Sequence, residues 1–176
     1  MDQVVTLVEF FSHNTINNVL GCFAFAPRTV IYLTDHSVEE SQRQGTLRAV
    51  HSRLPQTQVE FLTVEEEKLD SIRAALEELW RQHPEAVFDF TGGSETMLLA
   101  SFSFAVRHDA PMMHIHMESR SLVNIQGCEA LERQFVFPRL TLEDHLNMNG
   151  AFLAGNGYQD DLISTVMIDN VKVYKV

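Results

Sequence analysis

Segments with the residue pattern of a strand and segments with the pattern of a helix alternate along most of this chain. Apolar and β-branched runs predict five strands, at residues 4–11, 29–33, 58–64, 86–90 and 111–117. The intervening segments predict helices at residues 16–25, 35–54, 65–83 and 95–107. At least four strand-to-helix repeats indicate an α/β, Rossmann-like three-layer fold, in which helices cover both faces of a mainly parallel central sheet.

The helix predicted at residues 65–83 has the clearest periodicity, because Leu69, Ile72, Leu76 and Leu79 recur at three- and four-residue spacing. Its acidic first residues suit a helix start. The helix at residues 35–54 is predicted to begin at Ser37.

The last third of the chain is less regular. Residues 121–137 predict a C-terminal β-hairpin that turns near Gly127, and residues 140–150 predict a short helix that begins after Thr141 and ends at Gly150. Residues 151–176 predict a linker and the start of a C-terminal segment. We therefore expect one ligand-binding domain at residues 1–150, followed by a segment at residues 151–176 that belongs to a longer protein.

Composition restricts the classes of ligand. The chain has 176 residues and a formal net charge of −11, from 24 acidic and 13 basic side chains. Because affinity for long nucleic acids comes largely from Lys and Arg that neutralise phosphates, this charge argues against a general nucleic-acid binder. A small anionic ligand is still compatible, since a few backbone N–H groups can hold it locally.

The two cysteines and the N-terminal residues indicate the compartment. Cys22 and Cys128 are predicted to be buried, reduced thiols. The first residues lack the basic and apolar regions of a secretion signal, and no apolar run approaches the ~18 residues of a membrane span. These observations predict a cytoplasmic protein that does not bind a membrane.

Residues 88–100, FDFTGGSETMLLA, predict a strand that turns into a helix through a loop containing Gly92 and Gly93. If the strand order is 3-2-1-4-5, this loop lies beside the loop after the first strand, at the carboxyl ends where open parallel sheets bind ligands. Both loops precede helices, whose N-terminal N–H groups attract anions. The glycines would let the backbone approach a phosphate, and neutral donors surround them: Ser12, Asn14, Thr91, Ser94 and Thr96.

The alternative for the two glycines is a tight turn without a ligand. The segment is not a P-loop, because no Gly-Lys-Ser/Thr follows, and it lacks the G-x-G-x-x-G pattern of dinucleotide-binding folds.

Residues 6–34 and 89–100 together resemble the CARF domain (CRISPR-associated Rossmann fold) of type III CRISPR accessory proteins. The resemblance is closest to CARF domains that precede a PD-(D/E)xK nuclease, and it covers roughly residues 4–150. It implies a homodimer that binds a cyclic oligoadenylate, most often cyclic tetra-adenylate, across its two-fold axis and controls an effector in antiviral defence. It implies no cofactor.

The resemblance also implies which residues contact the ring. It places Thr91, Gly92, Gly93, Ser94 and Glu95 on the phosphate and ribose side, and Phe11, Ser12, His13 and Asn14 on the other side. Many family members carry Lys where this chain has Glu95. Either Glu95 faces a ribose hydroxyl or solvent, or amides and hydroxyls alone hold the phosphates.

Two alternative functions stay open. In the first, the same pocket is a metal-independent ring nuclease, with His13 as proton acceptor and Ser94 or Thr96 orienting the phosphate while the ribose 2′-OH attacks in line. In the second, the chain is a Rossmann-like protein-interaction domain with no nucleotide ligand.

Two further motifs give weaker indications of function. The nearest match to a PD-(D/E)xK motif, Glu66 and Lys68, falls in a predicted helix and is interpreted as a solvated face. His114 and His116 share one face of a predicted strand, where packing or interface roles are favoured. No metal site is predicted.

Overall fold

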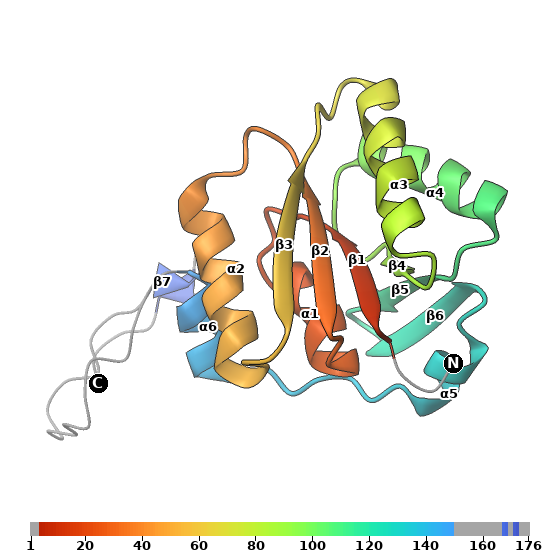
Figure 1. Cartoon of the computed structure of the whole chain (residues 1–176). Coiled ribbons are helices and arrows are strands. Elements are labelled where there is room, and N and C mark those ends of the chain that lie inside the picture. The colour runs from red at the N-terminus through yellow and green to blue at the C-terminus, as the bar shows by residue number, and fades with distance from the viewer. Residues whose placement is uncertain (1–3, 150–166, 169–170, 173–176) are drawn as a thin grey trace, which may run out of the picture.

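A six-stranded sheet in the order β3-β2-β1-β4-β5-β6 forms the centre of the molecule (Figure 1). The structure is a computed structural model, and it describes residues 4–149, 167–168 and 171–172. The pairs among β1 to β5 are all parallel, and β6 pairs with β5 in the antiparallel direction. The strands are β1 (Thr6–Phe10), β2 (Thr29–Thr34), β3 (Gln58–Thr63), β4 (Val87–Asp89), β5 (Met112–His116) and β6 (Ser121–Gln126). The predicted Rossmann-like fold is confirmed, and the strand order contains the sequence 3-2-1-4-5 that the expected meeting of the two loops required.

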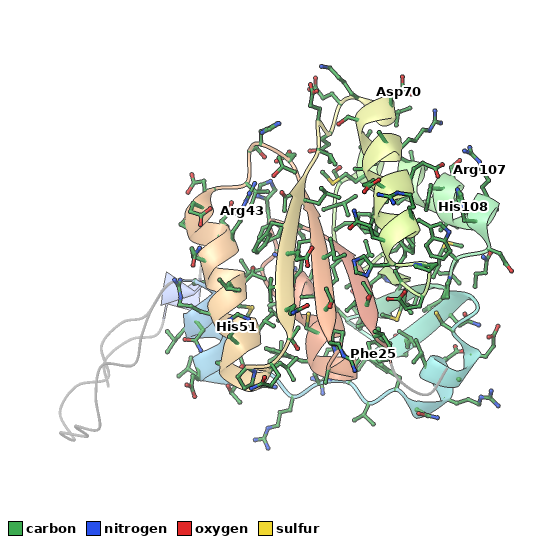
Figure 2. The ribbon with its side chains drawn as sticks, in the orientation of Figure 1. Phe25, Arg43, His51, Asp70, Arg107 and His108 are labelled. Carbon is green, nitrogen blue, oxygen red and sulfur yellow. The ribbon has the colours of Figure 1, made fainter. Side chains whose placement is uncertain are left out.

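Helices cover both faces of this sheet, and each face has its own apolar core. The side chains of α3 and α4 pack with those of one face, and α1, α2, α5 and α6 pack on the other (Figure 1). Side chains fill both interfaces (Figure 2). The helices are α1 (Asn17–Phe25), α2 (Glu40–Arg53), α3 (Leu69–Gln82), α4 (Glu95–His108), α5 (Glu129–Gln134) and α6 (Leu142–Met148).

The central strands are buried from end to end, which explains their continuous apolar runs. Every residue of β1 and β2 is buried. Leu7 faces α1 and α2, whereas the next residue, Val8, faces α3 and α4, because side chains alternate along a strand. Burial on both faces is typical of parallel sheets covered by helices.

The helix predicted to start at residue 65 begins four residues later, as α3 at Leu69. The preceding residues form a turn, in which the Lys68 N–H donates to the Glu65 carbonyl at 2.9 Å. The Glu65 N–H donates to the Ser71 hydroxyl at 3.1 Å. Residues 65–68 therefore belong to the loop that follows β3, at the carboxyl edge of the sheet.

α2 also begins later than predicted. Its N-cap is Glu39, which forms a capping box with Gln42, so the predicted start at Ser37 is wrong. The Ser37 hydroxyl instead donates to Asp35 at 2.6 Å, in a turn that follows β2. Ser37 hydrogen-bonds to Asp35, two residues earlier in the chain, and so does not cap the helix.

The β-hairpin predicted at residues 121–137 is wrong in its second half. β6 ends at Gln126 and pairs with β5, while residues 129–134 form α5. Gly127 turns the chain with a φ of 67°, and the Cys128 N–H donates to the Asn124 side chain at 2.9 Å. In α5, Leu131 is buried in the apolar core. The alternation of apolar and polar residues at 129–134 was too incomplete to form a second strand with one buried face.

The short helix at the end of the domain is confirmed. α6 begins after Thr141, whose capping box with Asp144 is complete. It lies alongside α2 (Figure 1), where Arg53 forms an ion pair with Asp144. The predicted end at Gly150 and the predicted linker lie outside the described residues, which include β7 (Met167–Ile168) paired with β8 (Val171–Lys172).

Both cysteines are buried free thiols, as predicted. Burial raises the pKa of Cys22, and it raises the pKa of Cys128 to about 12, so neither thiol is activated. Among the described residues, no helix is long and apolar enough to cross a membrane.

Candidate functional site

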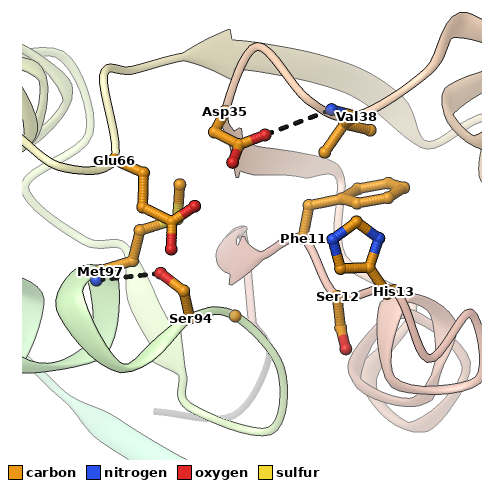
Figure 3. A pocket seen from close by; sticks show the side chains of 9 residues that line it. Phe11, Ser12, His13, Asp35, Val38, Glu66, Ser94 and Met97 are labelled. Atoms are coloured by element: carbon orange, nitrogen blue, oxygen red, sulfur yellow. Dashed lines mark hydrogen bonds between the residues drawn. The ribbon is translucent and has the colours of Figure 1, made fainter.

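The loops that follow β1, β2, β3 and β4 surround a cavity of about 250 Å³ at the carboxyl edge of the sheet (Figure 3). β1 and β4 are neighbours in the sheet, so the two loops that the sequence singled out meet here. The lining residues are Phe11, Ser12, His13, Asp35, Val38, Glu66, Gly93, Ser94 and Met97. Five of them, Phe11, Ser12, His13, Gly93 and Ser94, were predicted as site residues.

The loop after β1 is held by the first turn of α1. The Ser12 N–H donates to Asn18 Oδ1 at 2.8 Å, and Asn18 Nδ2 donates to the Ser12 carbonyl at 2.9 Å. The Asn14 N–H donates to the Ser12 hydroxyl at 3.1 Å. Asn18 is buried, whereas His13 and Asn14 are exposed at the tip of the loop. The loop is therefore fixed before any ligand arrives.

Asn18→Ala is expected to lower the free energy of unfolding by about 2 kcal/mol, because two hydrogen bonds of about 1 kcal/mol each are lost. Urea denaturation measures this change. Asn17→Ala is the control, since it removes an amide from the same helical turn without touching Ser12. Equal losses in the two variants would contradict a specific role of Asn18 in holding the loop.

Hydrogen bonds to the buried side chain of Asp89 hold the start of the loop after β4. Asp89 Oδ1 accepts hydrogen bonds from the Thr91 hydroxyl and, at 2.9 Å, from the Thr91 N–H. The Thr91 oxygen in turn accepts from the Ile115 N–H of β5 at 2.8 Å. The Thr91 hydroxyl is thus engaged with the sheet, which positions the glycine loop, and a direct ligand contact through it remains only a prediction.

The two glycines let the loop after β4 pack against the end of β1. A Cβ on Gly93, which has a φ of 99°, would lie 2.3 Å from Phe10 Cβ. A Cβ on Gly92 would lie 2.7 Å from the Phe10 carbonyl oxygen. The bare backbone is therefore required for loop packing, while Gly93 also lines the cavity. A bulky substitution at Gly93 cannot separate ligand binding from folding.

Ser94 begins α4 beside the cavity. Its hydroxyl accepts from the Met97 N–H at 3.3 Å, as an N-cap residue does (Figure 3). Glu95, in the first turn, is exposed. Thr96 lines a neighbouring hollow of about 540 Å³ together with Glu66 and Lys68. The positive end of the α4 dipole thus lies next to the cavity.

Asp35 and Glu66 line the cavity, although neither was predicted as a site residue. Glu66 was interpreted as a solvated face, but it is half-buried between the exposed Glu65 and Glu67. Asp35 follows β2 and Glu66 lies in the loop after β3. Open parallel sheets bind ligands at the carboxyl ends of their strands, and this rule applies to β2 and β3 as well as to β1 and β4. Applied to all four strands, it would have predicted both acids as site residues.

The two acids interact with each other. Partial burial acts to raise the pKa of Asp35, but hydrogen bonds from Glu66, Ser37 and Val38 outweigh it and hold this pKa at about 2. The interaction with Asp35 raises the pKa of Glu66, while the Ser94 hydroxyl and His13 act to lower it. The wall formed by these residues is rich in hydrogen-bond acceptors.

A second acidic pair lies beneath the loops, inside the core. Glu9 of β1 and Asp89 of β4 are register partners, and both are buried. Burial raises the pKa of Glu9 well above its usual value, with a further contribution from Asp89. Burial also raises the pKa of Asp89 to about 6. A Cβ on Gly21 of α1 would lie 2.6 Å from an oxygen of each acid, so the helix sits directly on the pair.

His114 and His116 of β5 have partners within the domain. His114 Nδ1 lies 3.2 Å from the Phe90 carbonyl oxygen, and His116 Nδ1 lies 2.9 Å from the Ser119 hydroxyl. Among the described residues, no three His, Cys, Asp or Glu side chains are grouped so that they could hold a metal ion.

The family model of the Card1 CARF domain matches residues 5–145, which include every strand and loop of this site. The chain belongs to the Card1 CARF domain family. The resemblance noted in the sequence is therefore confirmed, and it rests on the two loops that line the cavity. No protein with a curated function matches the sequence.

Solved structures share the fold of this CARF domain. Can2 from Sulfobacillus thermosulfidooxidans, in complex with cyclic tetra-adenylate, is 21% identical with a TM-score of 0.70, over 81% of this chain and 40% of Can2. Protein VC1899 from Vibrio cholerae is 16% identical with a TM-score of 0.69, over 82% of this chain and 39% of that protein. A type III CRISPR defence DNA nuclease activated by cyclic oligoadenylate is 16% identical with a TM-score of 0.57, over 84% of this chain and 24% of the nuclease.

Proposed function

We propose that this CARF domain is a sensor that binds a cyclic oligoadenylate, with cyclic tetra-adenylate as the first candidate. The observation that carries the proposal is the cavity where the loops after β1 and β4 meet, in a chain that belongs to the CARF family. Can2, which shares the fold, is seen in complex with cyclic tetra-adenylate. The phosphates would be held by loop N–H groups, by the Ser12 and Ser94 hydroxyls and by the start of α4.

The ring would be bound by a homodimer. The outer face of α4 exposes Leu99, Phe102 and Val106, with 71%, 45% and 50% of their surfaces accessible. Val123 and Ile125 of the edge strand β6 are exposed as well. Apolar side chains at such spacing on one helix face favour a protein interface. Because α4 begins at the glycine loop, pairing two copies along α4 would place two cavities on either side of one ring.

The sensor would be one module of a larger protein. The chain spans 40% of the length of Can2 and 39% of VC1899. We propose residues 1–150 as the ring-binding domain and residues 151–176 as the start of a segment toward an effector in type III CRISPR defence. α6, the last described helix of the domain, is fixed to α2 by the pair between Arg53 and Asp144.

A ring nuclease is the second candidate function, because His13 and Ser94 lie on opposite sides of the cavity (Figure 3). In such a reaction the ribose 2′-oxygen attacks the adjacent phosphorus and the 5′-oxygen leaves, which gives a 2′,3′-cyclic phosphate and a 5′-hydroxyl. His13 would accept the 2′-OH proton, Ser94 would hold a phosphate oxygen, and a proton from water would complete the 5′-hydroxyl.

Isothermal titration with cyclic tri-, tetra- and hexa-adenylate tests both candidates. A sensor is expected to bind the tetra-adenylate most tightly, at one ring per two chains, and to return it intact. Linear product that disappears in His13→Ala would establish the nuclease. If no ring binds, the sensor proposal fails, and the protein-interaction alternative is favoured.

Phe102→Glu tests the dimer. A charge buried in the α4 interface is expected to give a monomer in sedimentation and to weaken ring binding at least about 10-fold, since each half-site alone makes half of the contacts. Val136→Glu is the control, because Val136 is 77% exposed and lies outside α4 and β6. A dimer that survives Phe102→Glu would place the interface elsewhere.

A further inference from the structure

The wall of the cavity is chemically divided, and a nucleotide base fits this division. One part of its wall is apolar, formed by Phe11, Val38 and Met97. Another part carries the carboxyl groups of Asp35 and Glu66. A phosphate is unfavourable there, because carboxylates repel it. The flat face of a base suits the apolar wall, and hydrogen-bond donors on its edge suit the acids.

The volume of the cavity also points to a base. Pockets that enclose a whole drug-sized ligand measure roughly 300–1,000 Å³. This cavity, at about 250 Å³, is smaller, whereas a ring of four nucleotides is larger than a typical drug. The cavity in one chain can therefore receive one part of the ring, while the phosphates stay over the glycine loop and the start of α4.

Asp35 is already oriented for such a contact. The Ser37 N–H and hydroxyl donate to Asp35 Oδ1 at 2.7 Å and 2.6 Å, and the Val38 N–H donates to the same oxygen at 3.2 Å. Glu66 also hydrogen-bonds to Asp35, so the two carboxyl groups lie together at the cavity, and their remaining lone pairs are the acceptors there (Figure 3). Both acids come from loops after strands, so the sheet fixes their positions relative to the loops after β1 and β4.

We propose that Asp35 and Glu66 are the specificity-determining residues that recognise the exocyclic amino group of an adenine held in this cavity. The inference rests on the proposed function and goes beyond it, because it assigns the choice between adenine and other bases to Asp35 in the loop after β2 and Glu66 in the loop after β3. Adenine presents an N–H donor at this position, whereas hypoxanthine presents a carbonyl oxygen. A carbonyl oxygen cannot donate to the acceptor oxygens that the two carboxyl groups present to the cavity, so a ring with hypoxanthine should be rejected.

Binding of cyclic tetra-adenylate and cyclic tetra-inosinate, measured by isothermal titration, tests the inference. The wild-type protein is expected to bind the adenylate ring at least about 100-fold more tightly, since hydrogen bonds to charged groups are lost at two copies of the site. Glu66→Gln supplies an amide that can donate to the carbonyl, so this preference should fall at least about 10-fold. Asp35→Asn provides a second variant with the same expectation.

Glu67→Gln is the matched control, because it removes the same charge from the next exposed residue, which lines the neighbouring hollow and not the cavity. Its preference for the adenylate ring should equal that of the wild type. Thermal melting checks that each variant is folded.

The outcomes separate this inference from the proposed function. Equal binding of both rings by the wild type would overturn the inference and leave the sensor function intact. If Glu66→Gln instead abolishes discrimination against a 2′-deoxy ring, the acids contact ribose and the inference is wrong. If none of the cyclic tri-, tetra- and hexa-adenylates binds, the proposed function fails, and the inference fails with it.

Discussion

Gly93→Ala is expected to lower the free energy of unfolding by about 3–5 kcal/mol. Two causes add. Gly93 has a φ of 99°, which residues with a Cβ rarely adopt. The new Cβ would also lie 2.3 Å from Phe10 Cβ, so β1 or the glycine loop must shift. Urea denaturation followed by circular dichroism measures the change.

Two other glycines separate these causes. Gly127 has a φ of 67°, but a Cβ there would meet nothing closer than 3.6 Å, so Gly127→Ala is expected to cost only about 1–2 kcal/mol. Gly92 does not have a positive φ, yet its Cβ would lie 2.7 Å from the Phe10 carbonyl oxygen, so Gly92→Ala reports the contact alone. If Gly93→Ala is as mild as Gly127→Ala, the close packing of the glycine loop on Phe10 of β1 is not what stabilises this edge.

Asp89→Asn is expected to become more stable relative to the wild type as the pH rises, by about 3 kcal/mol between about pH 3 and about pH 8. Burial raises the pKa of Asp89 from 3.8 to about 6. Between these values the folded wild-type protein binds more protons than the unfolded chain, so its stability falls with rising pH. Asparagine does not titrate, and its side-chain oxygen can still accept the hydrogen bonds of Thr91.

The measurement is the difference in the free energy of unfolding between the two proteins at each pH, which cancels the titration of all other groups. Asp70→Asn is the control, because it removes a carboxylate whose side chain is fully exposed at the start of α3 (Figure 2). A flat curve for Asp89→Asn would show that the buried acid is ionised at no extra cost. A Glu9→Gln variant should show a change in the same direction, since burial also raises the pKa of Glu9.

The layered fold could be predicted from the sequence because its signals are local. A strand buried on both faces must be apolar throughout, and a helix that covers it must be apolar at three- and four-residue intervals. β1, β2 and α1 lie within a few residues of their predicted positions for this reason. The type of element was predicted wrongly where a segment is short: residues 129–134 alternate only in part, and they form α5, in which Leu131 is buried.

The site was predictable in part. Strand order and the rule that parallel sheets bind ligands at their carboxyl ends predicted the meeting of the loops after β1 and β4, and the sheet confirms that these strands are neighbours. The contribution of Glu66 was not predicted, because its charged neighbours made residues 65–68 look like the first turn of a helix. Only the actual start of α3 at Leu69 leaves Glu66 in the loop and turned toward the cavity.

By itself, the sequence determined the class of fold, the order of its elements and the two loops that meet at the site, since each depends on residues close together in the chain. The tertiary structure decided what those residues contact. Gly93 looked like an opening for a phosphate, but the nearest group to its missing Cβ is Phe10. Asp35 and Glu66 are 31 positions apart in the numbering, and they face one cavity only because β2 and β3 are adjacent and parallel. Contacts of this kind arise from pairing between distant strands, which no local pattern of residues records.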